Sequence, residues 1–263
     1  ICNGRYFDVK KNCFSREAYF FSKKGKYSLN SKKYKQLLFR GYTPPHQTTL
    51  FNGLSGILSN LYDDNFISGT GSRFMWFSGL SLLRIGYVSS YYWDEQFSGE
   101  NSIVFGHSSI AQGEYSIVTG GFYNKVLDHS SIISGGYENI ITPNNSIILG
   151  GQNNEIDANY SVIMGGFQNY TSDSGFVLGG NSNQIHGENS IVSGEHNTVN
   201  GHRSAILGGR YNIINSDNSM VFGSNSTSNH DNSILFNFTD FDRLSSIQNH
   251  IQIYAGNGMG INT

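Results

Sequence analysis

A short phrase of the form Ser-aliphatic-aliphatic-x-Gly recurs ten times between Asn101 and Asn237, at intervals of 14 or 15 residues. A unit this short cannot enclose an apolar core by itself, so it must stack on copies of itself. The pattern therefore predicts an all-β protein whose main part is a parallel β-roll, or β-solenoid, of about ten coils. The residues that open the copies are Ser102, Ser116, Ser131, Ser146, Ser161, Gly175, Ser190, Ser204, Ser219 and Ser233.

Two apolar positions follow each opening residue, and neighbouring positions of a strand point to opposite faces of a sheet. Because both positions are apolar in every coil, both faces of this strand should avoid water. One row should fill the roll and the other needs a cover, and the sequence leaves open which does which. The first row is Ile103, Ile117, Ile132, Ile147, Val162, Phe176, Ile191, Ala205, Met220 and Ile234. The second row is Val104, Val118, Ile133, Ile148, Ile163, Val177, Val192, Ile206, Val221 and Leu235.

The row that does not fill the roll predicts association between copies of the chain. Ten exposed apolar side chains on one stripe exceed what monomeric proteins tolerate, and burying each is worth about 1.5–3 kcal/mol. Identical rods arranged around an axis would cover the stripe. Residues 1–65 of the same chain are the alternative cover, although ten coils ~4.8 Å apart form a rod long for that zone.

A glycine pair and an asparagine follow the first strand in most coils, as in Gly150-Gly151 and Asn154. Glycine permits a sharp corner, and asparagine tolerates the left-handed region and can bond nearby backbone. Stacking should bring the asparagine amides into a ladder with a spacing of about 4.8 Å. A second strand, apolar on one side, follows each asparagine. The ladder positions are Asn124, Asn139, Asn154, Asn169, Asn183, Asn197 and Asn212.

The chain divides into four zones by pattern. They are a basic, aromatic-rich N-terminal region (1–65), a β cap or connector (66–99), the repeat (100–237) and a C-terminal strand tail (238–263). Leu54, Leu58 and Leu61 have helical spacing, so a brief helix near Leu50–Leu61 is expected.

In the cap, Arg73–Phe77 and Leu82–Val88 predict a strand pair. The bulky Tyr91, Tyr92 and Trp93 should cover the first coil. In the tail, alternation over Ile251–Tyr254 predicts a further strand.

The formal net charge is −2, but residues 1–65 carry 11 Lys and Arg against 4 Asp and Glu, and the remainder carries 6 against 15. The basic excess can be a solvated face, a contact for a polyanion or membrane surface, or the complement of another molecule's acidic rod. Cys2 and Cys13 can form a disulfide in an oxidising compartment or stay two thiols. A start at Ile1 rather than Met suggests a processed product.

The chain lacks the patterns that carry enzymatic chemistry. The eight histidines fall at irregular offsets without zinc-site spacing. We find no nucleophile elbow, phosphate-binding loop, calcium repeat or convincing carboxylate pair. No run of about 18 apolar residues predicts a membrane span. We therefore predict no enzyme, no cofactor or metal, no nucleic-acid partner and no membrane insertion.

At residues 99–237 the repeats resemble the head domains of trimeric autotransporter adhesins. The resemblance implies a left-handed parallel β-roll, assembled as a homotrimer and exposed at a cell surface. This chain departs from the family in its 15-residue coils and in aliphatic residues bulkier than the family's frequent alanine.

Arg73-Phe74-Met75-Trp76, Arg84-Ile85-Gly86-Tyr87-Val88 and the closing Gly258–Thr263 are similar to segments of bacterial and viral fibre proteins. Longer relatives of that kind often continue into an intramolecular chaperone that is cut off after trimerisation. An end at Thr263 fits such a trimmed product.

Three functions fit these patterns. The first is an extracellular homotrimeric head or fibre segment that binds a host or cell-surface protein or glycan by multivalent contact. The second is a subunit of an extracellular filament, assembled head to tail through the basic N-terminal region. The third is a viral or phage receptor-binding fibre. Candidate contact residues are Tyr123, Tyr137, Tyr170, His196, Arg210 and Tyr211.

Overall fold

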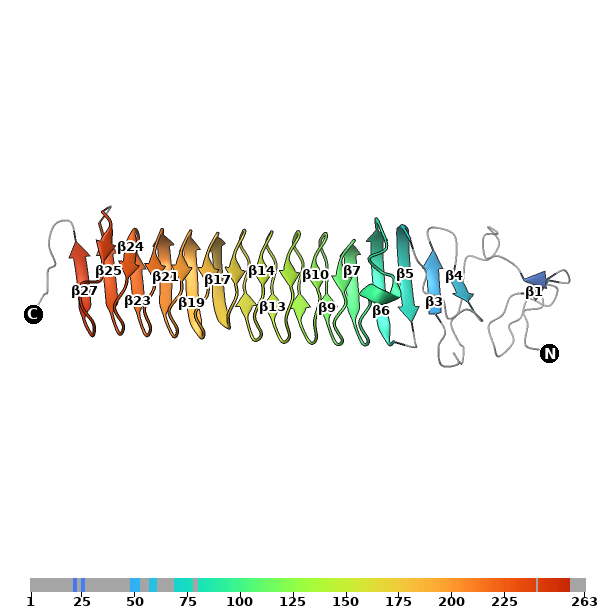
Figure 1. Ribbon diagram of the computed structural model, residues 1–263. Helices are drawn as coiled ribbons and strands as arrows, with labels where there is room; N and C mark the ends of the chain where they lie inside the picture. The colour runs from blue at the N-terminus through green and yellow to red at the C-terminus, as the bar shows by residue number, and fades with distance from the viewer. Residues whose placement is uncertain are drawn as a thin grey trace, which may run out of the picture.

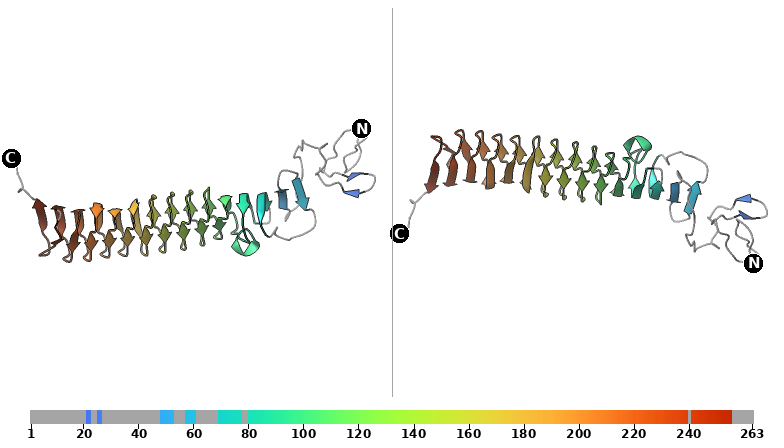
Figure 2. Two further views of the ribbon diagram at one scale, coloured as in Figure 1. Left: turned by 90° about the horizontal axis from the view of Figure 1, so that it is seen from above. Right: turned by 90° about the horizontal axis from the view of Figure 1, so that it is seen from below.

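The computed structural model describes residues 21–22, 25–26, 48–52, 57–60, 69–77, 80–239 and 241–255. The described part is all-β apart from one short 3₁₀ helix, η2 (Glu95–Phe97). Its strands follow one another along a rod from β5 to β27 (Figure 1). Figure 2 shows two rows of strands along this rod, which are a fifteen-stranded and a ten-stranded sheet. The all-β, parallel-solenoid fold predicted from the repeat is confirmed.

Each coil contributes one strand to each sheet. In the fifteen-stranded sheet the coil strands are β7 (Ile103–His107), β9 (Ile117–Val118), β11 (Ile132–Ile133), β13 (Ile147–Ile148), β15 (Val162–Ile163), β17 (Gly175–Asn181), β19 (Ser190–Glu195), β21 (Ala205–Arg210), β23 (Met220–Gly223), β25 (Ile234–Phe238) and β27 (Ile251–Ala255). In the ten-stranded sheet they are β8 (Ile110–Ala111), β10 (Lys125–Val126), β12 (Ile140–Ile141), β14 (Glu155–Ile156), β16 (Tyr170–Thr171), β18 (Gln184–Ile185), β20 (Thr198–Val199), β22 (Ile213–Ile214), β24 (Ser226–Ser228) and β26 (Arg243–Leu244).

Corresponding positions of successive coils pair in parallel, as Ile132 does with Ile147 and Ile133 with Ile148. This register keeps each kind of side chain in one column along the rod. The column from Val104 to Leu235 is fully buried between the two sheets, together with the second-strand column that includes Val126 and Ile214. The core is therefore a single apolar layer that continues through every coil.

At the first corner of each coil, the ladder asparagine does not adopt the left-handed conformation that its residue type tolerates. Asn153 has φ 53°, whereas its neighbour Asn154 is not among the residues with positive φ. The residue with the left-handed backbone conformation is thus the one before each ladder asparagine. The ladder asparagine itself is needed for its side-chain hydrogen bonds and not for its backbone conformation. Gly151 is required for close approach, since its φ is +89° and an added Cβ would lie 2.2 Å from the Gly166 carbonyl oxygen.

The helix expected near Leu50–Leu61 is wrong. β3 (Thr48–Asn52) and β4 (Ile57–Asn60) form an antiparallel pair in which Leu50 lies opposite Leu58. β3 also pairs with β5 (Gly71–Phe77), so its backbone is satisfied on both sides. This pairing and the β-preferring Thr-Thr-Leu-Phe sequence outweigh the helical spacing of three leucines.

The described N-terminal end of the solenoid is a strand pair that leads into the first coil. β5 runs antiparallel to β6 (Leu82–Val88), and β6 lies parallel to β7. A further antiparallel pair joins β1 (Phe21–Ser22) to β2 (Gly25–Lys26). At the other end, β26 and β27 continue both sheets beyond Asn237.

Two large side chains close the roll at β6. Trp93 is fully buried, and its Nε1 donates to the Ser109 carbonyl oxygen at 2.9 Å. Arg84 lies in the core column opposite Val104 and is fully buried as well. Its guanidinium donates to the Ser102 carbonyl oxygen at 3.0 Å and the Ala111 carbonyl oxygen at 3.2 Å. Burial lowers the pKa of Arg84, because a cation loses hydration there.

Candidate functional site

The outward face of the fifteen-stranded sheet is apolar along the described rod, and we call it the apolar face. Its first column is the row from Ile103 to Ile234, which one chain covers only in part, with Ile191 at 38% exposure. A second column lies two positions further along each strand, on the same side. Four of its side chains are 41–48% exposed: Leu149, Met164, Leu178 and Leu207.

This second outward column is absent from the prediction, although the alternation of the strand could have revealed it. Phe105, Phe222 and Phe236 extend it, and the rings of Phe222 and Phe236 stack with centroids 4.7 Å apart. Thr119, Ser134 and Ser193 interrupt it, which hides the pattern in the sequence. The apolar face is thus two side chains wide in most coils.

The apolar face also continues beyond the ten repeats. Leu83 of β6 lies beside Ile103 in parallel register. At the C-terminal end, Ile251 and Ile253 of β27 extend the two columns and are 64% and 41% exposed. The face therefore spans the described rod from β6 to β27.

The outward face of the ten-stranded sheet is different, and we call it the polar face. Its central column changes chemistry from coil to coil: Lys125, Glu155, Tyr170 and Gln184 are interspersed with the aliphatic Ile140 and Ile213. Side chains bond between coils there: the hydroxyl of Tyr170 donates to Asp157 at 3.1 Å. The pKa of Tyr170 is raised by burial and by this bond to Asp157. The polar face is suited to water or to a polar ligand.

The asparagine ladder lies inside the first corner. Asn154 is fully buried, and its Nδ2 donates to Asn139 Oδ1 at 3.1 Å, to Gly150 at 3.2 Å and to Gly166 at 3.0 Å. All seven ladder asparagines are fully buried. Because these amides bond within the chain, the ladder holds coils together rather than contacting a ligand.

Serines end the ladder, and the sequence reading missed them. The backbone N–H of Asn124 donates to Ser109 Oγ at 3.2 Å, and that of Ser226 donates to Asn212 Oδ1 at 3.1 Å. Their column position, one coil beyond the last asparagine on each side, is the signal that could have identified them.

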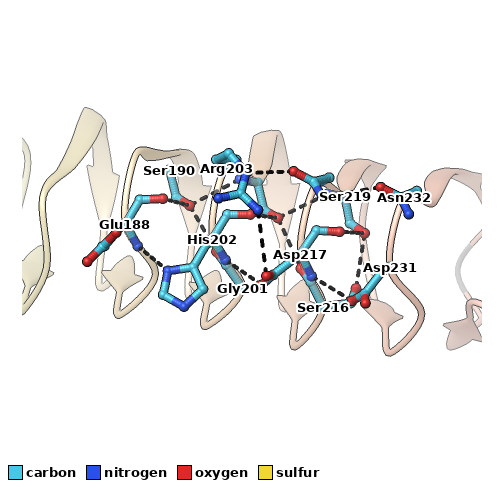
Figure 3. A network of polar contacts seen from close by, with 12 residues as sticks. Glu188, Ser190, Gly201, His202, Arg203, Ser216, Asp217, Ser219, Asp231 and Asn232 are labelled. Atoms are coloured by element: carbon cyan, nitrogen blue, oxygen red, sulfur yellow. Dashed lines mark hydrogen bonds and ion pairs between the residues drawn. The ribbon is translucent and has the colours of Figure 1, made fainter.

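The second corner carries a polar network that Figure 3 shows for four coils. The backbone N–H of His202 donates to Asp217 Oδ1 at 2.9 Å, and that of Asp217 donates to Asp231 Oδ1 at 2.9 Å (Figure 3). Ser190 Oγ donates to the Gly201 carbonyl oxygen at 2.9 Å. Opening serines and corner carboxylates are thus engaged in joining coils. Among the described residues, no group of three or more His, Cys, Asp or Glu could hold a metal ion.

The predicted contact residues lie at or near the first corner and on the polar face. Tyr137, His196, Arg210 and Tyr211 are exposed, while Tyr123 and Tyr170 are half-buried. The rings of His196 and Tyr211 stack at 5.3 Å between centroids with an interplanar angle of 5°. The structure brings this pair together, whereas Tyr123 belongs to a separate aromatic cluster with Tyr137, 6.2 Å away.

Two tyrosines at the second corner are more exposed than most of the predicted ones. Tyr160 is 74% exposed and Tyr115 is 59% exposed. Their φ angles are 59° and 58°, which bulky residues rarely adopt. The sequence gives little signal for them, because most coils place Asn or Ser at this position.

The Cys2–Cys13 pair lies outside the described residues. Residues 1–65, the alternative cover for the apolar face, are described only in short backbone segments. In the part of the chain that the structure describes, none of the helices has the length and apolar character of a membrane span.

Together these surfaces define a class of protein: an extended parallel β-solenoid with one apolar and one polar outward face. Residues 98–122 and 215–234 match the family model described as the YadA head domain repeat, one copy near each end of the roll. These repeats and the solenoid fit the head of a trimeric autotransporter adhesin, which confirms the resemblance seen in the sequence. YadA-type heads are homotrimeric, cell-surface-exposed and non-enzymatic. No curated protein and no solved structure matches the chain.

Proposed function

We propose that this chain is the head of an extracellular homotrimeric fibre that binds surfaces by multivalent contact. Three copies would bury their apolar faces around a common long axis and present their polar faces outward. One observation carries the proposal. The outward row beside the core is apolar in all ten coils, yet one chain leaves Ile191 of this row 38% exposed and Leu178 of the second column 44% exposed.

The energetics favour association over a single rod. A contiguous apolar patch of more than a few hundred Å² is rare on a monomer, and this one runs along more than ten strands. Each fully buried aliphatic side chain contributes about 1.5–3 kcal/mol. A closed ring of identical rods covers every copy of the face, and the trimeric state of YadA-type heads supports the number three.

The polar face would supply the contacts to a host or cell surface. Three copies present the same polar and aromatic groups, so weak contacts add through effective concentration. The exposed Tyr137, His196, Arg210 and Tyr211 are the candidate contacts, since Tyr and Arg are enriched in binding surfaces. The partner class is a surface protein or glycan.

Light scattering and sedimentation of the purified chain test the assembly. We expect a particle three times the 29.1 kDa mass of one chain, at concentrations down to the micromolar range. A well-folded species of 29.1 kDa would overturn the trimer. Adhesion of labelled protein to cells, compared between trimer and an interface-disrupted monomer, tests the binding role. Equal adhesion by both would overturn multivalency.

The filament and the viral or phage fibre stay predictions from the sequence. The filament depends on the basic region of residues 1–65, most of which lies outside the described residues. High salt should break such filaments into trimers, because exposed charges are screened.

A further inference from the structure

A groove of about 450 Å³ lies on the polar face beside the loop that carries η2. This loop bulges from the side of the rod (Figure 2), and Ser98 of the loop pairs with Ala111 of β8. Tyr92 of the loop reaches the groove, and successive coils provide the rest of the lining. The lining includes Tyr92, Tyr123, Lys125, Glu138, Ile140 and Glu155.

Two of the three charged side chains of the groove are free to meet a ligand, and the third, that of Glu138, bonds with Tyr137. No ion pair or hydrogen bond of the Lys125 or Glu155 side chain occurs among the described residues. Burial and the neighbouring Asp157 raise the pKa of Glu155, and its side chain stays exposed and accessible to a ligand.

The fold does not require these residues. The column of Tyr123 holds Asn153 and Asn225, residues that accept the left-handed conformation readily. Tyr123 has φ 56°, a conformation that a bulky residue rarely takes. The column of Glu155 holds Gln184. Other coils thus build the same backbone with Asn and Gln in these columns. The backbone therefore does not explain why the groove carries Tyr123 and Glu155.

We propose that this groove binds a neutral saccharide, which names the ligand class of the surface binding proposed above and rests on that function. Sugar hydroxyls both donate and accept hydrogen bonds, so they match a lining that combines an ammonium, two carboxylates and tyrosine hydroxyls. The tyrosine rings offer apolar area for the C–H face of a sugar ring.

Charge and size narrow the ligand class further. Glu138 and Glu155 outnumber Lys125 and so oppose an anionic ligand, while Lys125 weakens the attraction of the lining for a cationic one. The volume falls within the roughly 300–1,000 Å³ of small-molecule sites. A short neutral oligosaccharide therefore satisfies the groove better than a charged ligand of either sign.

Binding of immobilised neutral tetrasaccharides of glucose, galactose and N-acetylglucosamine tests the proposal. A sialylated glycan and an oligolysine peptide are the charged probes. Tyr123→Asn and Glu155→Gln introduce residues that other coils already hold in the same columns, so folding should be retained. Each should weaken binding of the preferred neutral tetrasaccharide by about tenfold or more. The matched control, Tyr160→Asn, changes an exposed left-handed tyrosine at the second corner, outside the groove and in a column that already holds Asn145, and should leave binding unchanged.

Three results would overturn the groove proposal. They are no binding of any neutral tetrasaccharide, equal weakening by Tyr123→Asn and Tyr160→Asn, and binding of only a charged probe. Sedimentation of the same samples distinguishes failure of the groove proposal from failure of the proposed fibre function. A trimer that binds no sugar overturns the groove alone, whereas a monomer with saturable, Tyr123-dependent binding overturns the assembly alone.

Discussion

The two outward faces of the solenoid share one backbone and differ in chemistry. Both belong to parallel sheets with the same coil-to-coil register, and both back onto the same buried core. On the apolar face, Ile147 and Val162 continue a column that is apolar in all ten coils. On the polar face, the column of Glu155 and Tyr170 changes from coil to coil. Stacking alone therefore requires neither pattern, and the uniform face supports the proposed trimer, in which every coil would meet a partner.

The largest expected effect is loss of assembly when the apolar face is charged. Leu178→Glu places a carboxylate on β17 where the proposed trimer excludes water, and burying an unpaired charge costs several kcal/mol. We expect a single-chain species by sedimentation. Gln184→Glu on the polar strand β18 is the control and should stay trimeric. A trimer of undiminished stability in Leu178→Glu would show that this face is not the interface.

Neighbouring residues of one strand should next separate the core from the apolar face. Ile163 is fully buried and Val162 is half-buried on the outward side. Ile163→Ala should lower the free energy of unfolding by about 2–5 kcal/mol through a cavity. Val162→Ala should cost less, and its effect should depend on protein concentration because it acts through association. Denaturant unfolding at several concentrations measures both, and a concentration-independent loss in Val162→Ala would contradict the assignment.

The ladder that supports both faces should show a smaller loss. Asn154→Ala removes bonds to Asn139, Gly150 and Gly166 and leaves the buried backbone N–H and amide of Asn169 without the Asn154 Oδ1 acceptor. We expect a loss of about 1–3 kcal/mol in the free energy of unfolding. Asn200→Ala is the control, because its amide bonds Asn215 at an exposed site. Equal losses of unfolding free energy in the two variants would show that the buried ladder stabilises the fold no more than an exposed amide pair does.

The repeat made the fold and the core predictable, while the corners and ends were not. A short unit that must stack in register forces each apolar position into a column, so Val104 and Ile148 could be assigned to one column from spacing alone, but not to the core side of the strand. The left-handed φ of Tyr160 could not, since stacking of neighbouring coils imposes it against the preference of the residue. Pairing of β3 with β5 likewise outweighed the leucine spacing that suggested a helix.

The candidate surfaces were predicted less completely than the core. The sequence identified an apolar row that needs a cover, but not the second row through Leu149 and Leu178, because serine and threonine interrupt it in three coils. The groove depends on Tyr92 from the loop and Glu155 from the fourth coil, which only the folded chain brings together.

The smallest effect should appear at the polar face, in the ionisation of Tyr170. Burial raises the pKa of this phenol, and the bond to Asp157 raises it further. The folded chain therefore keeps the Tyr170 phenol protonated above pH 10 better than the unfolded chain does. The stability that the protonated phenol contributes is present below pH 10 and is lost as the pH rises through the folded pKa. Asp157→Asn should shift the alkaline ultraviolet titration of Tyr170 towards the ordinary tyrosine value, as isolated by comparison with Tyr170→Phe. Asp231→Asn, at the second corner, should leave that titration unchanged, and an equal shift in both variants would mean that net charge rather than the Tyr170–Asp157 bond sets the pKa.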